Sequence, residues 1–334
     1  MITPFGLRHI GLLRDLQGDC MALDVKTPLL EEPATPLRAA LRAYLLGSRS
    51  GLCTYVLRTA DHGSHLRGFA QTKANRSGPA WTVLRLAPAL DSSDDAGTIW
   101  YRLLLHLCIA AGESGVQRMF ASLPEDHSGE EVLRQAGFAN YCRERIFWRA
   151  SVDGGVLSPR IRPVLPADLW DVQRLYHKVT PQLVLMAEEP NGLRADASAS
   201  WTVASNDEQA YVLYGQPGEV LGYTHITLGP RGAWLRLMVG HGAYGSAPEM
   251  LDHALAVLNG LAPRPVYCEV RQYQSSIQTV VEDKGFELAS AHSLWVKHTT
   301  LRVREPKRKL VPALEKRAEV APTISRSEAE LEAR

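Results

Sequence analysis

Hydrophobic and polar positions along residues 160–303 predict a series of alternating strands and helices. Short apolar-rich runs predict strands at 161–165, 210–214, 220–226, 234–239 and 265–270, with final strands within 289–299. Apolar residues at helical spacing predict helices after Asp168, at 249–258 and at 276–284. Asp168 is the expected N-cap of the first helix, and Gly285 is expected to end the last one in the left-handed conformation.

The same order of elements is predicted earlier in the chain. The pattern predicts strands at 52–58, 68–72, 81–86, 116–123 and 143–149, and helices at 98–111 and 129–136. Residues 1–47 show no comparably clear periodicity.

Three short motifs recur in the same order, which indicates two copies of one domain. The Gly-Phe pairs at 137–138 and 285–286 are 148 residues apart. Leu-Arg-Leu occurs at 84–86 and again 151 residues later, and the motif at 66–69 is echoed 154 residues later. Each match alone could be chance, but nearly constant spacing of all three predicts a duplication.

Gly, Ser and Pro, which favour turns and loops, are frequent at residues 151–159 and indicate the boundary between the two copies. We expect an N-terminal domain at 1–150, a C-terminal domain at 159–303 and a charged tail at 304–334. The tail has few large apolar residues, so it is expected to be a disordered segment or a loosely held helix.

Composition and charge argue against several classes of function. The 334 residues include 37 Lys and Arg against 36 Asp and Glu, a net charge of +1, which argues against nucleic-acid binding through bulk charge. The five cysteines are scattered without a CxxC pair, which favours reduced thiols in the cytoplasm and no metal site. No apolar run is long enough to span a membrane, and the N-terminus does not read as an export signal.

The second copy resembles the GNAT superfamily of N-acyltransferases. The resemblance rests on the order of elements, Ile161-Arg162-Pro163 before Ala167-Asp168, the strand, loop and helix at 234–258, and Lys284-Gly285-Phe286. It implies an α/β fold in which a mixed sheet is flanked by helices, present here as a tandem of two copies. In that family the sheet opens between its fourth and fifth strands, where acyl-CoA binds, and the following loop and helix start hold the pyrophosphate.

The resemblance places an acyl-CoA site in the second copy. Gly245 and Ala247 match the small residues of the phosphate loop, although Tyr244 stands where Arg or Gln is usual. The implied cofactor-binding residues are Leu237, Val239, Gly240, His241, Gly242, Gly245, Ser246 and Ala247.

The first copy departs from that loop. It carries Asp91, Asp94 and Asp95 beside the position of the phosphates and Ile99 at the second small position. Carboxylates repel phosphate, so we expect this copy not to bind CoA and read its loop as a solvated loop with an N-cap before a buried helix.

The resemblance also implies a carboxylate base and a tyrosine acid. Glu269 and Tyr273 are the candidate catalytic residues of the second copy, but the usual tyrosine position, four before Gly285, is Val281. Glu269 can equally be a strand residue paired with Arg236 or Arg271. His225 has a substrate-binding and a structural interpretation, and both stay open.

The implied function is N-acetyl transfer in the C-terminal copy, from acetyl-CoA to the amine of a small molecule or peptide. The first copy is then a structural partner within a monomer that acts as a pseudo-dimer. The alternative is a catalytically inactive binding or scaffold protein that keeps the fold.

Overall fold

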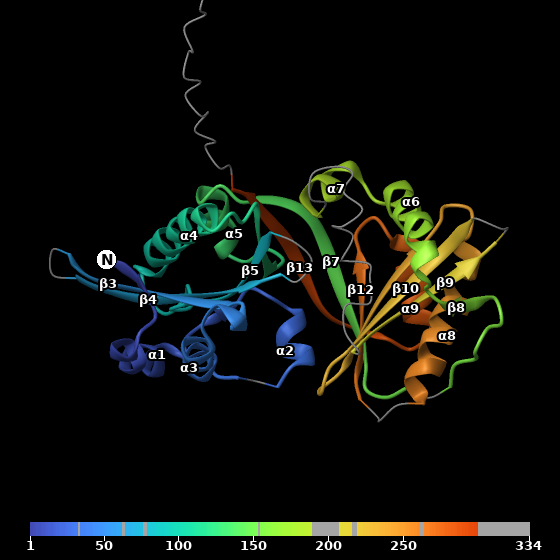
Figure 1. Cartoon of the computed structure of the whole chain (residues 1–334), viewed down its shortest axis with the longest axis horizontal. Coiled ribbons are helices and arrows are strands. Elements are labelled where there is room, and N and C mark those ends of the chain that lie inside the picture. The colour runs from blue at the N-terminus through green and yellow to red at the C-terminus, as the bar shows by residue number, and fades with distance from the viewer. Residues whose placement is uncertain are drawn as a thin grey trace, which may run out of the picture. The chain divides into compact units, whose positions relative to one another are not determined.

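The computed structural model describes residues 1–32, 34–61, 64–75, 79–152, 154–188, 207–215, 219–260 and 264–299. Its strands form a 13-stranded sheet in the order β1-β3-β4-β5-β6-β13-β7-β12-β11-β10-β9-β8, while β2 pairs with β5 off this path (Figure 1). The predicted tail at 304–334 lies outside the described residues.

The first half follows the predicted order from residue 52 onward. Its strands are β1 (Ile2–Pro4), β2 (Met21–Ala22), β3 (Leu52–Asp61), β4 (Ser64–Ala74), β5 (Ala80–Ala87), β6 (Arg118–Pro124) and β7 (Ala139–Arg149). Its α-helices are α1 (Ile10–Leu16), α2 (Lys26–Leu30), α3 (Pro36–Leu46), α4 (Ala96–Glu113) and α5 (Gly129–Gln135). The first three helices and two short strands lie in the segment that the sequence pattern left without a prediction.

The second half repeats that order. Its strands are β8 (Ile161–Pro163), β9 (Glu208–Tyr214), β10 (Val220–Leu228), β11 (Ala233–Val239), β12 (Val266–Arg271) and β13 (Glu287–His298). Its helices are α6 (Leu169–Val179), α7 (Gln182–Glu188), α8 (Ala247–Asn259) and α9 (Ser275–Asp283), with short 3-10 turns η3 (Pro166–Asp168) and η5 (Tyr244–Ser246). The final strands predicted at 289–299 are one continuous strand, β13.

The last strand of each half pairs with the other half. β7 of the first half lies antiparallel to β12 of the second, with Ile146 opposite Glu269. β13 of the second half lies antiparallel to β6 of the first, with Leu294 opposite Ser122, and it also pairs with β7 (Figure 1). This exchange leaves neither β6 nor β12 as an open sheet edge. It also brings side chains of the first half next to strands of the second.

Helices cover both faces of each half. In the first half α4 buries Trp100 and Leu104 against one face, while α1 places Leu13 against the other (Figure 1). In the second half α8 buries Leu251 on one face and α6 buries Tyr176 on the other. Apolar side chains at helical spacing form these cores, because burying them removes their surface from water.

Two glycines end equivalent helices of the repeat. Gly137 has φ +81° and Gly285 has φ +76°, the left-handed region that residues with a Cβ rarely adopt. The next residue then donates back to the helix, from Phe138 N–H to Leu133 O at 3.0 Å and from Phe286 N–H to Val281 O at 3.3 Å. The predicted C-cap at Gly285 is therefore confirmed.

The predicted role of Asp168 needs a correction. Asp168 occupies the N-cap position of α6, but its side chain makes no capping hydrogen bond to that helix. Its carboxylate instead accepts from Leu165 N–H at 2.7 Å and forms a two-pronged ion pair with Arg162 at 2.7 and 3.0 Å. Pro166 begins a 3-10 turn before α6, and the Asp168 carboxylate caps the start of this turn instead of the start of α6.

Candidate active site

Strands β11 and β12 of the second half run parallel and then separate. They pair from Ala233 opposite Val266 to Arg236 opposite Glu269. β11 continues to Val239 and β12 to Arg271, but these terminal residues of the two strands do not pair with each other. The pair Arg236 and Glu269 therefore marks the point of divergence, and the fourth and fifth strands of this copy open as the resemblance implies.

A single side-chain amide links the separated ends of these strands. Gln274 Nε2 donates to the carbonyl of Leu237 at 2.8 Å, and Gln274 Oε1 accepts from the N–H of Arg271 at 3.0 Å. Buried backbone groups need such partners, and here one rotatable side chain satisfies both strands. A ligand that binds between the strands has to replace this amide.

The loop after β11 leads directly into the N-terminus of α8. Gly240 N–H donates to Leu221 O at 2.8 Å and fixes the start of the loop. A Cβ atom added at Gly242 or Gly245 would meet no other atom within 4 Å, so the backbone there is open to a ligand. Ser246, at the N-cap of α8, makes no side-chain capping bond. Exposed amides at a helix start suit an anion.

His241 of the same loop is held by two hydrogen bonds. Its Nε2 lies 3.1 Å from the carbonyl of Lys178, so this nitrogen carries the proton and donates. Its Nδ1 then accepts from the hydroxyl of Tyr244, at 2.7 Å. These hydrogen bonds hold the loop against α6. The predicted contact of His241 with phosphate stays a prediction, and it requires the ring to give up one of these partners.

The corresponding divergence in the first half is filled by the chain itself. β5 and β6 pair only from Ala80 opposite Arg118 to Thr82 opposite Phe120. Beyond that point Leu23 lies between them: its N–H donates to Leu84 O at 2.8 Å, and its carbonyl accepts from Ser122 N–H at 2.8 Å. The Leu23 side chain is fully buried in the core of this half. A backbone segment therefore occupies the place that the resemblance gives to the arm of CoA.

The loop before α4 keeps the acidic character noted in the sequence. Asp91, Asp94 and Asp95 are all exposed at the start of this helix. Asp95 occupies the N-cap position of α4, but its side chain makes no capping hydrogen bond. Negative side chains at this helix start repel phosphate.

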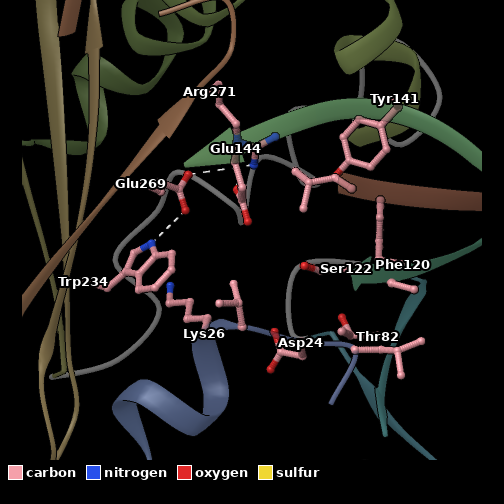
Figure 2. A pocket seen from close by; sticks show the side chains of 14 residues that line it. Asp24, Lys26, Thr82, Phe120, Ser122, Tyr141, Glu144, Trp234, Glu269 and Arg271 are labelled. Carbon is pink, nitrogen blue, oxygen red and sulfur yellow. Dashed lines mark hydrogen bonds and ion pairs between the residues drawn. The ribbon is translucent and has the colours of Figure 1, made fainter. Parts of the chain in front are cut away.

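Glu269 lies at the centre of a buried charge cluster at the divergence of β11 and β12 (Figure 2). Its Oε2 accepts from the indole N–H of Trp234 at 2.7 Å, and its Oε1 lies 2.9 Å from Nε of Arg236. Arg271 is 3.8 Å from the same oxygen. Burial raises the pKa of Glu269, but the nearby arginines outweigh burial and leave the pKa below its ordinary value.

Two further carboxylates share Arg271 with Glu269. Glu188, at the end of α7, lies 2.9 Å from Arg271 and accepts from the hydroxyl of Tyr176 at 2.9 Å. Burial opposes its ionisation, yet Arg271 and Arg236 hold its pKa at about 2. Glu144, on the exchanged strand β7, lies 3.3 Å from Arg271, and burial outweighs that ion pair and raises its pKa to about 7.

Tyr273 lies just after β12, separated from it by Gln272, and is beside this cluster. Its ring packs with Cys142, Val184 and Leu294, and its hydroxyl makes no hydrogen bond within the described residues. Burial raises its pKa, which keeps the phenol protonated at neutral pH. A protonated phenol without a partner can donate to a ligand.

Two adjoining cavities open onto the cluster. The smaller, about 170 Å³, is lined by Glu144, Glu269, Arg271, Trp234 and Lys26 among others (Figure 2). The larger, about 550 Å³, shares Lys26, Trp234 and Glu269 with it and extends along β10 to His225. Lys26 belongs to α2 of the first half, and Glu144 to its exchanged strand. Both halves therefore line the same space.

The predicted site residues fall into two groups in the structure. Glu269 and Tyr273 lie at the divergence, and the loop residues from Gly240 to Ala247 lie at the start of α8. Lys26, Glu144 and Glu188 were not predicted as site residues from the sequence. Glu144 did leave a signal, because it is a charged residue at an inward position of β7, between buried Cys142 and Ile146. Lys26 left none, because it lies in the segment without clear periodicity.

Two absences hold within the described part of the chain. No group of three or more His, Cys, Asp and Glu side chains there could hold a metal ion. None of the helices in those residues combines the length and apolar character that crossing a membrane requires.

No protein-family model matches the sequence, and no curated protein matches it. Solved structures do match the fold. One is a tandem GNAT protein from the clavulanic acid biosynthesis pathway, with a TM-score of 0.50 and 15% identity, covering 90% of this chain and 98% of that one. The chain has a tandem GNAT fold.

A second structure agrees with this assignment. The GCN5-related N-acetyltransferase from Sphaerobacter thermophilus is similar to the chain with a TM-score of 0.51 and 11% identity, over 90% of this chain and 95% of that one. At these identities the likeness shows the fold alone. The tandem GNAT fold expected from the repeat is therefore confirmed, as is the mixed sheet flanked by helices.

Proposed function

We propose that the protein is an N-acyltransferase that uses an acyl-CoA, with its chemistry in the second half. The observation that carries this proposal is the difference between the two strand divergences. In the second half, strands β11 and β12 separate beside Gly242 and Gly245, whose backbone is open to a ligand. In the first half, Leu23 of the same chain fills the corresponding position.

The predicted cofactor-binding residues form two groups, each of which would hold a different part of acyl-CoA. The edge of β11 at Leu237 and Val239 would bind the pantetheine arm once Gln274 turns away from Leu237 O. Backbone amides of Gly240 to Ala247 would bind the pyrophosphate, helped by the positive end of α8. Acetyl-CoA is the acyl donor that we propose.

The site offers groups for both proton transfers of acyl transfer. The amine nitrogen attacks the thioester carbonyl, the C–N bond forms and the C–S bond breaks. Tyr273 would give its proton to the leaving thiolate. A carboxylate would take the proton that the amine loses.

Two carboxylates compete for the role of base. The sequence predicts Glu269, which is ionised and bound by Arg236 and Trp234, so it is a weak proton acceptor. Glu144 lines the smaller cavity with it and has a pKa of about 7, close to the value that suits a base at neutral pH. We therefore propose Glu144 as the proton acceptor, and the base role of Glu269 stays a prediction.

A non-catalytic binding or scaffold role is the second candidate. It is favoured by Gln274, which closes the divergence of β11 and β12, and by the mutual pairing of the charges around Glu269. A protein with this role would keep the fold but consume no acyl-CoA.

Acetyl-CoA binding, followed by calorimetry, tests the proposed function. Gly245→Glu places a carboxylate at the start of α8, so we expect it to weaken binding at least about tenfold by charge repulsion and loss of open backbone. Ser93→Glu, in the exposed loop of the first half, is the matched control and should leave binding unchanged. No binding by the parent protein would overturn the proposal. Binding without thiol release from any amine would support the scaffold role.

A further inference from the structure

The larger cavity is lined by a cation, Lys26, that has no ionic partner among the described residues. Lys26 Nζ donates to the hydroxyl of Thr227 at 3.1 Å and lies 5.8 Å from the centre of the Trp234 ring. No carboxylate of the described residues lies within 4 Å of this ammonium. The nearby Asp24 accepts from the N–H of Thr27. A half-buried ammonium without a counter-ion is unfavourable, so a ligand anion would stabilise it.

A second group beside Lys26 has a ring nitrogen without a hydrogen-bond partner among the described residues. His225 is 8% exposed, and its Nε2 is buried without a hydrogen bond in the described structure. His225 and Thr227 lie on the same face of β10, so the imidazole is next to the hydroxyl that binds Lys26. Burial, Lys26 and Arg236 lower the pKa of His225 to about 4. At neutral pH the ring is uncharged and can donate one N–H.

The other end of the same cavity is acidic and lies at the strand divergence. Glu269 binds the indole N–H of Trp234 at 2.7 Å, while Lys26 lies over the ring of that indole. One tryptophan side chain thus separates the ammonium from the carboxylate. Figure 2 shows Lys26 and Glu269 on either side of Trp234, facing the smaller cavity.

We infer that the acceptor is a small zwitterion, an amino acid or similar amine that also carries a carboxylate. Lys26 and His225 bind the carboxylate, and the amine lies towards Glu269 and the point where β11 and β12 diverge. This inference rests on the proposed function, because it names the acceptor class of the same site. A simple amine would leave Lys26 without an anion.

Matched acceptor pairs test this inference in the full-length protein. Thiol release from saturating acetyl-CoA is measured with glycine and methylamine, L-phenylalanine and 2-phenylethylamine, and L-lysine and cadaverine. We expect the carboxylate-bearing member of at least one pair to be preferred at least tenfold in kcat/KM, the size of one hydrogen bond to a charged group. Lys26→Met should remove that preference by raising KM for the amino acid, with little change for the plain amine.

Lys73→Met is the matched control. Lys73 lines the same cavity but is paired with Glu31 at 3.0 Å, so its loss changes the charge equally without removing the proposed carboxylate site. We expect the acceptor preference to survive in this variant. Circular dichroism and a thermal melt confirm that both variants fold.

The outcomes separate this inference from the proposed function. Thiol release that does not depend on the carboxylate, or a Lys26→Met effect equal for both members of each pair, overturns the zwitterion and leaves the acyltransferase intact. Without thiol release, the thermal shift produced by the three amino acids decides. A shift that Lys26→Met abolishes supports the carboxylate site even if the acyltransferase proposal fails. No shift in the parent protein overturns the site.

Discussion

The two strand divergences of this protein have the same origin and are closed in different ways. In both halves two parallel strands separate, so that their facing backbone groups no longer pair with each other. The first half closes this opening with the peptide groups of Leu23, which lie between Leu84 and Ser122. The second half closes it with the side-chain amide of Gln274.

The difference lies in how easily each closure can be removed. Displacing Leu23 would unpair a backbone segment and expose a fully buried side chain, and both changes are costly. Displacing Gln274 needs only rotation of one side chain, and an incoming amide group can replace both of its hydrogen bonds. The second divergence is therefore suited to a ligand, and the first is suited to holding its half together.

The largest effect is expected from removing the buried side chain that anchors the closing segment of the first half. Leu23→Ala leaves a cavity in the core around Leu23, so we expect it to lower the free energy of unfolding by about 2–5 kcal/mol, measured by urea denaturation. Leu23→Met keeps the volume and should cost less than about 1.5 kcal/mol. Equal, small effects of both substitutions would show that the Leu23 side chain does not anchor this segment.

A smaller effect is expected from Glu144, the residue of the first half that lies in the site of the second. Burial raises the pKa of Glu144 to about 7, above its unfolded value, so the folded protein holds this proton between about pH 4.5 and 7. Stability should fall as pH rises through that window, and Glu144→Gln should remove this fall. As the proposed base, Glu144 should also give an acid limb near pH 7 in kcat/KM, and Glu144→Gln should reduce turnover about a hundredfold.

Glu269→Gln is the comparison for that measurement. If the acid limb persists in Glu144→Gln and disappears in Glu269→Gln, the base is the residue that the sequence predicts. Turnover unchanged in both variants would remove this pair of carboxylates from the reaction.

The smallest effect is expected at the closure of the second half. Gln274→Ala leaves Leu237 O and Arg271 N–H without their partner, so we expect a loss of about 1 kcal/mol in the free energy of unfolding. Because acyl-CoA no longer has to displace the amide, its affinity should rise about fivefold by calorimetry, equivalent to about 1 kcal/mol. Gln272→Ala, an exposed neighbour, is the control. Weaker binding in Gln274→Ala would contradict the proposed closure and make Gln274 part of the binding site.

Local patterns predicted the elements well where they are strong. Helical periodicity located α8 and α9, and the Gly-Phe pairs located two helix ends with left-handed glycines. The same patterns failed at β2 and α2, because Leu23 is buried through contacts with β5 and β6 rather than through a local period. The N-cap prediction at Asp168 gave the correct position but the wrong bond, because Arg162 and the Leu165 N–H of the preceding turn hold that carboxylate.

The sequence by itself determined the duplication, the order of elements and the acidic loop of the first copy, because each follows from residues close together in the chain. Only the tertiary structure decided which strands cross between the halves and what closes each divergence. It also decided that Lys26 and Glu144 of the first half face Glu269 of the second. Contacts between residues more than a hundred positions apart depend on strand exchange and burial, and no local period records them.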